Sequence, residues 1–215
     1  MNKRWLLPLL FSLLPFGAHA DTLGIVVGAG SWGPSASGNL TASGVGADFD
    51  KASSGTMMWA AIEHPIPLIP NFKYVQLPVS ASNAAGDSLT LNQTDMIFYY
   101  EVLDNWISVD VGLNWKTIDG GITTVAPAAT QSFNTPVPMA YVKGTVEIPA
   151  TKVTVGAEMS TLSGFTDMAY FVSYESSVGF GVEVGQRTQT IAVNVDTIDS
   201  DLKLGGTYMA VFYHF

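Results

Sequence analysis

Apolar and polar residues alternate one by one along much of this chain, most clearly in the segment NWISVDVGLNWKT. One face of that segment carries Ile107, Val109, Val111, Leu113 and Trp115, and the other carries Ser108, Asp110, Gly112, Asn114 and Lys116. A period of two residues is that of a β-strand. The apolar face lasts longer than a typical strand of a soluble β-sandwich. The pattern therefore indicates a strand whose two faces meet different solvents.

The same alternation recurs along the chain and predicts ten strands. They fall at residues 22–32, 54–64, 71–81, 89–103, 106–118, 138–148, 151–162, 166–175, 178–192 and 202–215. A different division of 138–162, or loss of the second strand to the loop before it, leaves eight. An even number of amphipathic strands is typical of an all-β, antiparallel, up-and-down transmembrane β-barrel.

The predicted connections alternate between short and long, as they do in outer-membrane barrels. With the N-terminus on the periplasmic side, the long outer loops are residues 33–53, 119–137 and 193–201. Short inner turns fall at 104–105, 149–150 and 176–177. Two connections depart from this pattern: the outer loop at 163–164 is short, and the inner turn HPIPLIPN at 64–71 is long.

The C-terminal segment YMAVFYHF alternates in the same way, although a chain end normally frays. In a closed barrel the last strand pairs with the first, which explains its strand pattern. Met209, Val211, Tyr213 and Phe215 then face lipid. A terminal Phe preceded by alternating apolar residues resembles the signal read by the barrel assembly machinery, so we expect that machinery to be a partner during biogenesis.

The first twenty residues have the layout of a secretory signal peptide. Lys3 and Arg4 precede an apolar run from Trp5 to Phe16, and Ala18-His19-Ala20 forms an A-x-A cleavage site. We therefore expect residues 1–20 to be removed and residues 21–215 to form a single barrel domain. The formal charge then changes from -9 to 7 minus 18, or -11, which makes nucleic acid a poor partner.

Composition narrows the choice of fold. Hydrophobic residues make up 47% of the chain and charged residues 13%, yet the two longest uncharged stretches, 22–47 and 120–142, are rich in Gly and Ser or contain prolines. Neither fits a membrane helix. The chain has no cysteine, which excludes a disulfide scaffold. A secreted sandwich gives no reason for the aromatic residues near strand ends, whereas the aromatic girdles of a membrane barrel do; these residues are Trp59, Tyr100, Trp106, Trp115, Tyr174 and Tyr213.

The whole chain resembles a family of small outer-membrane β-barrel proteins of Gram-negative bacteria whose function is unassigned. The segments that carry the resemblance are HPIPLIPN, residues 94–113 (TDMIFYYEVLDNWISVDVGL) and the closing FYHF. The family's name links it to genomes with a GlyGly-type C-terminal sorting system. This chain has Gly205-Gly206 inside a predicted strand with no helical anchor after it, so we do not expect it to be a sorting substrate. The resemblance implies no catalytic residue.

Charged residues of both signs fall on the predicted inward faces. Mixed charges on neighbouring strands favour a satisfied internal network over a selectivity filter, because unpaired charges in a narrow lumen are costly. Gly179, Gly181 and Gly185 either widen the lumen or make room for Tyr99, Tyr208 or Phe212, and we favour the second reading. The predicted lumen network comprises Asp95, Glu101, Asp110, Lys116, Lys143, Glu147, Glu158, Glu183 and Arg187, with Lys152, Asp167 and Glu175 also on the inward side.

We expect no enzymatic activity and no cofactor. The mature chain has only His64 and His214, both predicted at the periplasmic end, and neither belongs to a signature for nucleophilic catalysis. The loop NVDTIDSD offers Asp196, Asp199 and Asp201 as a candidate Ca²⁺ site, but it lacks the spacing of an EF-hand loop. A solvated acidic loop is the favoured interpretation.

The sequence thus predicts an integral outer-membrane barrel with a largely side-chain-filled interior and a non-enzymatic envelope role. One alternative is a narrow cation-preferring diffusion pore. Another is a surface recognition protein acting through the outer loops 33–53 and 119–137. We expect a monomer in contact with outer-membrane lipids and lipopolysaccharide.

Overall fold

The computed structural model describes residues 23–66, 68–195 and 198–215, and all its regular elements are β-strands. The predicted signal peptide, residues 1–20, lies outside the described residues. The strands are β1 (Gly24–Ala42), β2 (Val45–Phe49), β3 (Lys51–Ser53), β4 (Gly55–Glu63), β5 (Asn71–Ser82), β6 (Ser88–Asp104), β7 (Ile107–Val125), β8 (Ala128–Ile148), β9 (Val153–Leu162), β10 (Phe165–Glu175), β11 (Phe180–Val195) and β12 (Ile198–His214).

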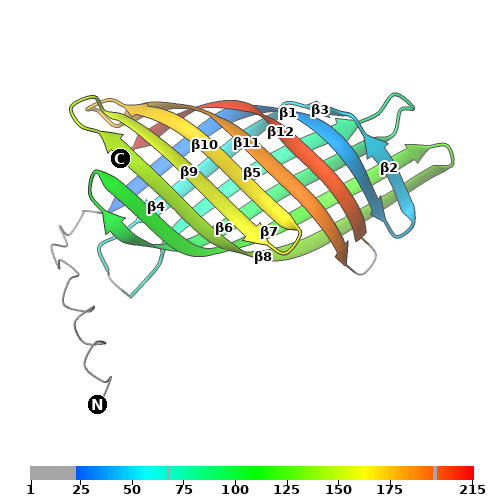
Figure 1. The fold of residues 1–215 in the computed structure, drawn as a ribbon, viewed down its shortest axis with the longest axis horizontal. Coiled ribbons are helices and arrows are strands. Elements are labelled where there is room, and N and C mark those ends of the chain that lie inside the picture. Colours follow the sequence, from blue (N-terminus) through cyan, green and yellow to red (C-terminus); the bar gives the residue numbers. More distant parts are fainter. Residues whose placement is uncertain (1–22, 67, 196–197) are drawn as a thin grey trace, which may run out of the picture.

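These strands close into an antiparallel barrel of ten strands, as the sequence predicts. Consecutive strands of the ring pair with each other, and β12 pairs with β1 to close it, with Tyr213 opposite Val27. Figure 1 shows a long cylinder with the C-terminus at one end and the β2 hairpin at the other. We call these the C-terminal end and the hairpin end. The closure satisfies the backbone groups of the last strand and explains why the chain terminus is strand.

The second strand of the barrel is interrupted and consists of β4, β3 and β2. β4 pairs with β1 from Gly55 opposite Trp32, and β2 pairs with the far part of β1 from Phe49 opposite Gly38. Between them β3 pairs with β5 instead. The interruption shifts this stretch from one neighbour to the other without opening the ring.

The predicted outer loops 33–53 and 119–137 are wrong, because both segments are mainly strand. β1 continues to Ala42 before turning at 43–44, and β7 and β8 continue to a turn at 126–127. Residues 193–195 and 198–201 of the third predicted loop are also strand, while 196–197 lie outside the described residues. The short connection at 163–164 and the inner turns are present as predicted.

The predicted loops are wrong because apolar and polar residues still alternate in these segments, but the apolar residues change from the outward face to the inward face. On β7 the outward face is apolar up to Trp115 and then turns polar with Thr117 and Asp119. The inward face changes in the opposite sense, from Lys116 to the buried Ile118 and Ile122. A tilted strand crosses a bilayer in about 9 to 11 residues, and β7 has 19. The half of β7 beyond Trp115 is therefore patterned like a strand of a soluble barrel.

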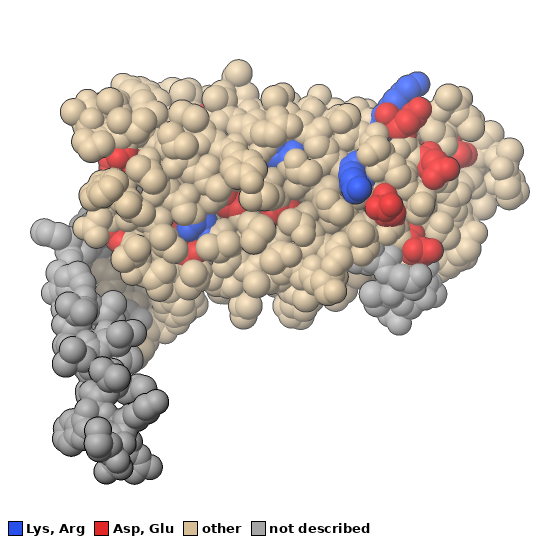
Figure 2. Space-filling model, in the orientation of Figure 1, with Lys and Arg blue, Asp and Glu red and all other residues tan. Residues whose placement is uncertain are grey.

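The outward face carries a band of exposed apolar side chains nearer the C-terminal end, among them Leu113, Val172, Val184, Met209 and Val211. In Figure 2 the middle of the face in view is largely uncharged, and charged side chains gather toward the hairpin end. The predicted girdle residues Tyr100, Trp106, Trp115, Tyr174 and Tyr213 are exposed. Trp59 is an exception and a correction: it lines a cavity inside the barrel, because its position faces inward opposite Gly28.

No helix in the described residues is long and apolar enough to cross a membrane.

Candidate functional site: the interior of the barrel

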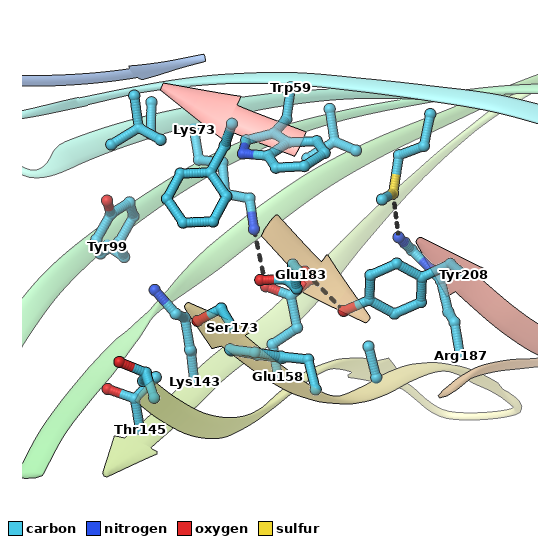
Figure 3. Close-up of a pocket in the computed structure, with 18 of the residues that line it drawn as sticks. Trp59, Lys73, Tyr99, Lys143, Thr145, Glu158, Ser173, Glu183, Arg187 and Tyr208 are labelled. Atoms are coloured by element: carbon cyan, nitrogen blue, oxygen red, sulfur yellow. Dashed lines mark hydrogen bonds and ion pairs between the residues drawn. The ribbon is translucent and has the colours of Figure 1, made fainter. Parts of the chain in front are cut away.

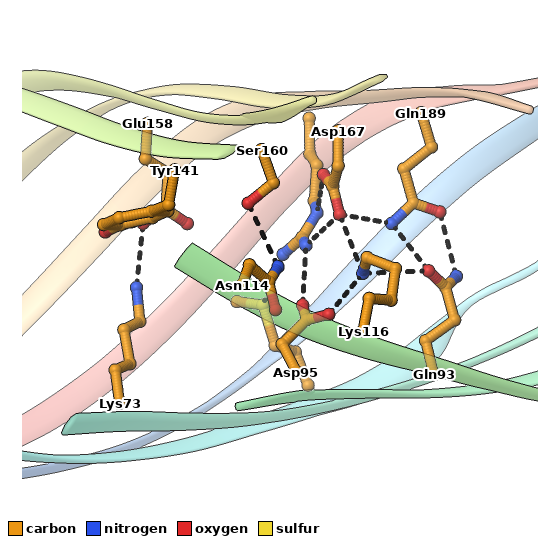
Figure 4. Close-up of polar contacts among 12 residues, drawn as sticks. Lys73, Gln93, Asp95, Asn114, Lys116, Tyr141, Glu158, Ser160, Asp167 and Gln189 are labelled. Carbon is orange, nitrogen blue, oxygen red and sulfur yellow. Dashed lines mark hydrogen bonds and ion pairs between the residues drawn. The ribbon is translucent and has the colours of Figure 1, made fainter. Parts of the chain in front are cut away.

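A cluster of charged and amide side chains crosses the interior near its middle (Figure 4), and we call it the plug. It consists of Gln93, Asp95, Lys116, Asp167, Arg187 and Gln189, all buried. Lys116 Nζ lies 2.6 Å from Asp95 Oδ1 and 3.2 Å from Asp167 Oδ2. Arg187 holds Asp167 with two parallel bonds, Nε to Oδ1 at 2.8 Å and Nη2 to Oδ2 at 2.6 Å. Such a bidentate pair fixes the orientation of both groups.

Two glutamines complete the plug on the side toward the hairpin end. Gln189 Nε2 donates to Asp167 Oδ2 at 2.8 Å, and the Gln93 and Gln189 amides bond each other at 2.9 and 3.0 Å. Lys116 Nζ also donates to Gln93 Oε1 at 3.3 Å. The plug therefore contains two carboxylates and two cations, and its formal charge is zero. Its members come from β6, β7, β10 and β11, so it ties together strands on both sides of the lumen.

Beyond the plug, toward the hairpin end, the interior is an apolar core. Its side chains come from almost every strand and interlock across the lumen. The most deeply buried include Trp32, Leu40, Phe49, Leu77, Leu89, Leu91, Ile122, Phe165, Leu202 and Leu204. Leu77, Leu89, Leu202 and Leu204 each have 0% of their surface exposed, which leaves no room for a water column beside them.

Between the plug and the C-terminal end lies a cavity of about 240 Å³, which we call the vestibule (Figure 3). It is open toward the C-terminal end: the Lys143 side chain on its wall is 28% exposed, while Lys116 in the plug is 0% exposed. Lys73 Nζ lies 2.8 Å from Glu158 Oε2, and Lys143 Nζ lies 3.6 Å from Asp110 Oδ2. The vestibule is therefore a pocket with one mouth.

Tyrosine hydroxyls hold the other two carboxylates of the vestibule wall. Tyr99 Oη donates to Glu63 Oε1 at 2.8 Å, and Tyr208 Oη donates to Glu183 Oε1 at 2.8 Å. Both tyrosine rings are buried. Each of these carboxylates is thus oriented by a neutral donor.

The vestibule stays open because its aromatic rings lie over glycines of the neighbouring strand. Trp59 is directly opposite Gly28, and a Cβ on that glycine would overlap the indole ring. Phe212 has the same relation to Gly181, and Tyr208 to Gly185. Glycines paired with aromatic residues across strands are a recognised device of β-barrels. Gly185 and Gly181 make room for Tyr208 and Phe212, as predicted, and in doing so keep these rings against the wall. The prediction is wrong for Gly179, which lies in the turn before β11 with a φ of 82° and approaches the backbone of His214.

The structure distributes the predicted lumen residues over two levels of the interior. Asp95, Lys116 and Arg187 meet in the plug. Lys143, Glu158 and Glu183 line the vestibule, and Asp110 lies beside it, paired with Lys143. Glu101 and Glu147 are exposed at its mouth and at the rim. Asp167 is a central member of the plug, and Glu175 lies 3.5 Å from His214 at the C-terminal end. Lys152 is wrong as an inward residue, since it lies in an exposed turn with a φ of 59°.

Several interior residues were not predicted from the sequence. Gln93 and Gln189 continue the inward series of Asp95 and Arg187 at a spacing of two, so the same alternation identifies them. Lys73 lies inside β5. A single lysine in NFKYVQL does not show which face of the strand points inward. Glu63 is the last residue of β4. Its place on the inward face can be predicted only when the end of that strand is known.

The other predicted sites lie at the surface. Met209, Val211, Tyr213 and Phe215 all point outward at the C-terminal end. Asp199 and Asp201 are exposed on β12, and Asp196 lies outside the described residues. No group of three or more potential metal ligands occurs among the residues that the structure describes.

No family model matches the chain, and no curated protein matches it. Solved structures do resemble it. The crystal structure of the outer membrane protease OmpT from Escherichia coli superposes with a TM-score of 0.53 at 9% identity, covering 92% of this chain and 99% of that chain. The match supports the barrel fold and leaves the resemblance to the family of unassigned function as a prediction.

Two further outer-membrane structures align over most of the chain with lower scores. OprG from Pseudomonas aeruginosa gives a TM-score of 0.41 at 9% identity, covering 92% of this chain and 97% of that chain. Ail of Yersinia pestis, crystallised with the heparin analogue sucrose octasulfate, gives 0.39 at 10% identity and covers 91% and 100%.

Proposed function

We propose that the chain is an integral outer-membrane β-barrel protein with a closed interior that does not conduct ions, and that its role in the envelope is non-enzymatic. The membrane location is supported by the closed ring of strands, by the outward apolar band with exposed aromatic residues, and by the likeness to OmpT in fold. The predicted signal peptide agrees with this location. The C-terminal end then faces the periplasm and the hairpin end faces outward.

The observation that carries the closed interior is the burial of both the plug and the apolar core. Lys116, Leu77 and Leu202 each have 0% exposure. A conducting lumen needs a continuous polar water path, and here apolar side chains follow the plug along the axis. A cation-preferring pore would require both layers to move aside.

Planar-bilayer recording of the folded protein tests this proposal. Heat-modifiable mobility on a gel first verifies that the inserted protein is folded, and a general porin inserted in the same way verifies that the bilayer reports conductance. We expect no steps above baseline. Stable steps with cation preference would establish the pore instead.

The absence of catalysis is supported by the placement of the histidines. His64 and His214 both lie at the C-terminal end, and the hairpin end has no histidine among the described residues. OmpT is described as a protease, yet at 9% identity the likeness in fold brings no catalytic residue. Incubation of the folded protein with a mixed peptide library should leave the peptides intact; reproducible cleavage at defined sites would refute this part.

A recognition role at the cell surface is the second candidate, and the inverted pattern of β7 favours it. The protruding hairpins, formed by residues within 33–53 and 119–137, have polar outward faces over an apolar core. That arrangement presents a preformed surface. Removal of residues 123–130, which form the paired end of the β7–β8 hairpin beyond the buried Ile122, should abolish any partner binding while leaving the heat-modifiable mobility unchanged.

A further inference from the structure

The charges inside the barrel do not balance. Among the described residues the interior has four cations: Lys73, Lys116, Lys143 and Arg187. Together with the mouth it has seven carboxylates: Glu63, Asp95, Glu101, Asp110, Glu158, Asp167 and Glu183. Seven minus four leaves three negative charges, so three carboxylates have no cation of their own.

The excess negative charge is confined to the vestibule and its mouth. The plug is neutral, Lys73 pairs with Glu158, and Lys143 pairs with Asp110. Glu63 and Glu183 form no ion pair within 4 Å in the described part of the chain, and each accepts a tyrosine hydroxyl instead.

At the mouth the imbalance appears as a direct repulsion. Glu101 stands directly opposite Asp110 across β6 and β7, and like charges at such a position are destabilising. Lys143 on the next strand is directly opposite Asp110 and forms its ion pair there, at 3.6 Å. A positive charge from outside the chain would relieve this pair and would be attracted into the mouth.

The walls determine what kind of cation fits. A bare metal ion needs several converging ligands, and the described residues contain no such group. The vestibule is lined by Glu63, Glu158 and Glu183 and by Lys73, Lys143 and Arg187. The three cations are engaged in ion pairs with Glu158, Asp110 and Asp167, so Glu63 and Glu183 are left without a cation beside the rings of Trp59, Tyr208 and Phe212, which lie against the wall over glycines. Aromatic faces attract organic cations through their ring quadrupoles. A volume of about 240 Å³ holds a small molecule.

We propose that the vestibule binds a small organic cation of the alkylammonium class, held between Glu63, Glu183 and the Trp59 ring. The ligand enters from the C-terminal end, and the plug prevents it from crossing the barrel. The proposal rests on the proposed function only in identifying that end with the periplasm. It adds a ligand class to a cavity that otherwise has no assigned role.

Choline and its uncharged isostere 3,3-dimethylbutan-1-ol test the proposal on the folded protein in detergent micelles. The two molecules have nearly the same shape and differ in charge, and isothermal titration calorimetry at pH 8 measures both. We expect saturable binding of choline at a stoichiometry of one, with the alcohol bound at least about tenfold more weakly. Equal binding of the two, or no binding of choline, would overturn the proposal.

Two variants and one control locate the site. Glu183→Gln and Glu63→Gln should each weaken choline binding by about tenfold, the size expected for the loss of one charged contact. Glu147→Gln removes an exposed rim carboxylate that does not line the vestibule and should bind choline like the parent protein. Unchanged affinity in Glu183→Gln and Glu63→Gln would place the cation elsewhere and refute the site.

The outcome for the ligand is separate from the outcome for the closed barrel. If bilayer recording shows no conductance and choline does not bind, only the ligand proposal fails. If conductance appears while choline binds with the predicted variant pattern, the closed interior fails and the cation site stands. Heat-modifiable mobility of every variant verifies that a loss of binding is not a loss of fold.

Discussion

Replacing Lys116 by methionine removes the charge at the centre of the plug while keeping the length of the side chain. Lys116 is fully buried and lies 2.6 Å from Asp95 and 3.2 Å from Asp167. At an effective dielectric constant of about 20, these distances correspond to gross attractions of about 6 and about 5 kcal/mol. Desolvation offsets much of this gain, so the measurable quantity is the cost of leaving buried carboxylates unpaired, about 3 to 5 kcal/mol.

The second substitution Asp95→Asn should restore much of that loss. The double variant leaves Asp167 with Arg187, a pair with two parallel bonds and no net charge. We expect Lys116→Met to lower the free energy of unfolding by about 3 to 5 kcal/mol. The double variant should lose less than the single one, with a coupling energy of at least about 2 kcal/mol.

Urea unfolding in lipid vesicles, followed by tryptophan fluorescence, measures both quantities. Lys203→Met serves as the matched control because Lys203 is exposed on β12, and such a surface change should stay within about 0.5 kcal/mol. The reasoning is refuted if Lys116→Met behaves like the control, or if its effect and that of Asp95→Asn simply add.

Two more predictions concern the wall and the hairpin end. Gly28→Ala places a Cβ in the Trp59 ring and should lower the free energy of unfolding by about 1 to 3 kcal/mol. Gly144→Ala is the control, because a Cβ there meets nothing within 4 Å, and its stability should equal that of the parent protein. Equal unfolding midpoints for the two variants would contradict this prediction. Asp87, in the loop after β5, has a pKa below its usual value because Asn83 and the Val125 amide bond its carboxylate. The Asp87 carboxylate therefore stabilises the loop above the ordinary pKa of 3.8, and this stabilisation is lost as the pH falls through the lower pKa of the folded protein. An NMR titration of the Asp87 carboxyl group measures that pKa. A value at or above 3.8 would contradict the bonds from Asn83 and the Val125 amide.

The fold was predictable because apolar and polar residues alternate strictly in the part of many strands that lies nearer the C-terminal end. The faces of β7 were assigned correctly from Ile107 to Lys116. The prediction ended at residue 118 because it followed the apolar outward face, which stops at Trp115. Ile118, Ile122 and Thr124 continue the inward series with the same period. The sequence therefore does indicate the longer strand, but beyond Trp115 the apolar side chains lie on the inward face and the polar ones on the outward face.

The contacts of the interior are harder to predict from the sequence, because they depend on which residues face each other across the barrel. Asp95 and Lys116 face each other on neighbouring strands, and correct pairing of β6 with β7 is enough to find them. Asp167 meets Lys116 from β10, and no pairing of neighbours predicts that contact. Trp59 was assigned to the surface because its inward direction follows only from its register with Gly28.

Cysteine accessibility along the lumen tests the closed barrel with a single mouth most directly, because the chain has no cysteine of its own. Ser173→Cys places a thiol on the vestibule wall, Ser160→Cys places one beside Asn114 at the level of the plug, and Ser200→Cys places one among the buried residues near the hairpin end. A small cationic methanethiosulfonate reagent should modify the first thiol rapidly and leave the other two unmodified in the folded protein. Comparable rates at all three positions would show a continuous water path and contradict the closed interior.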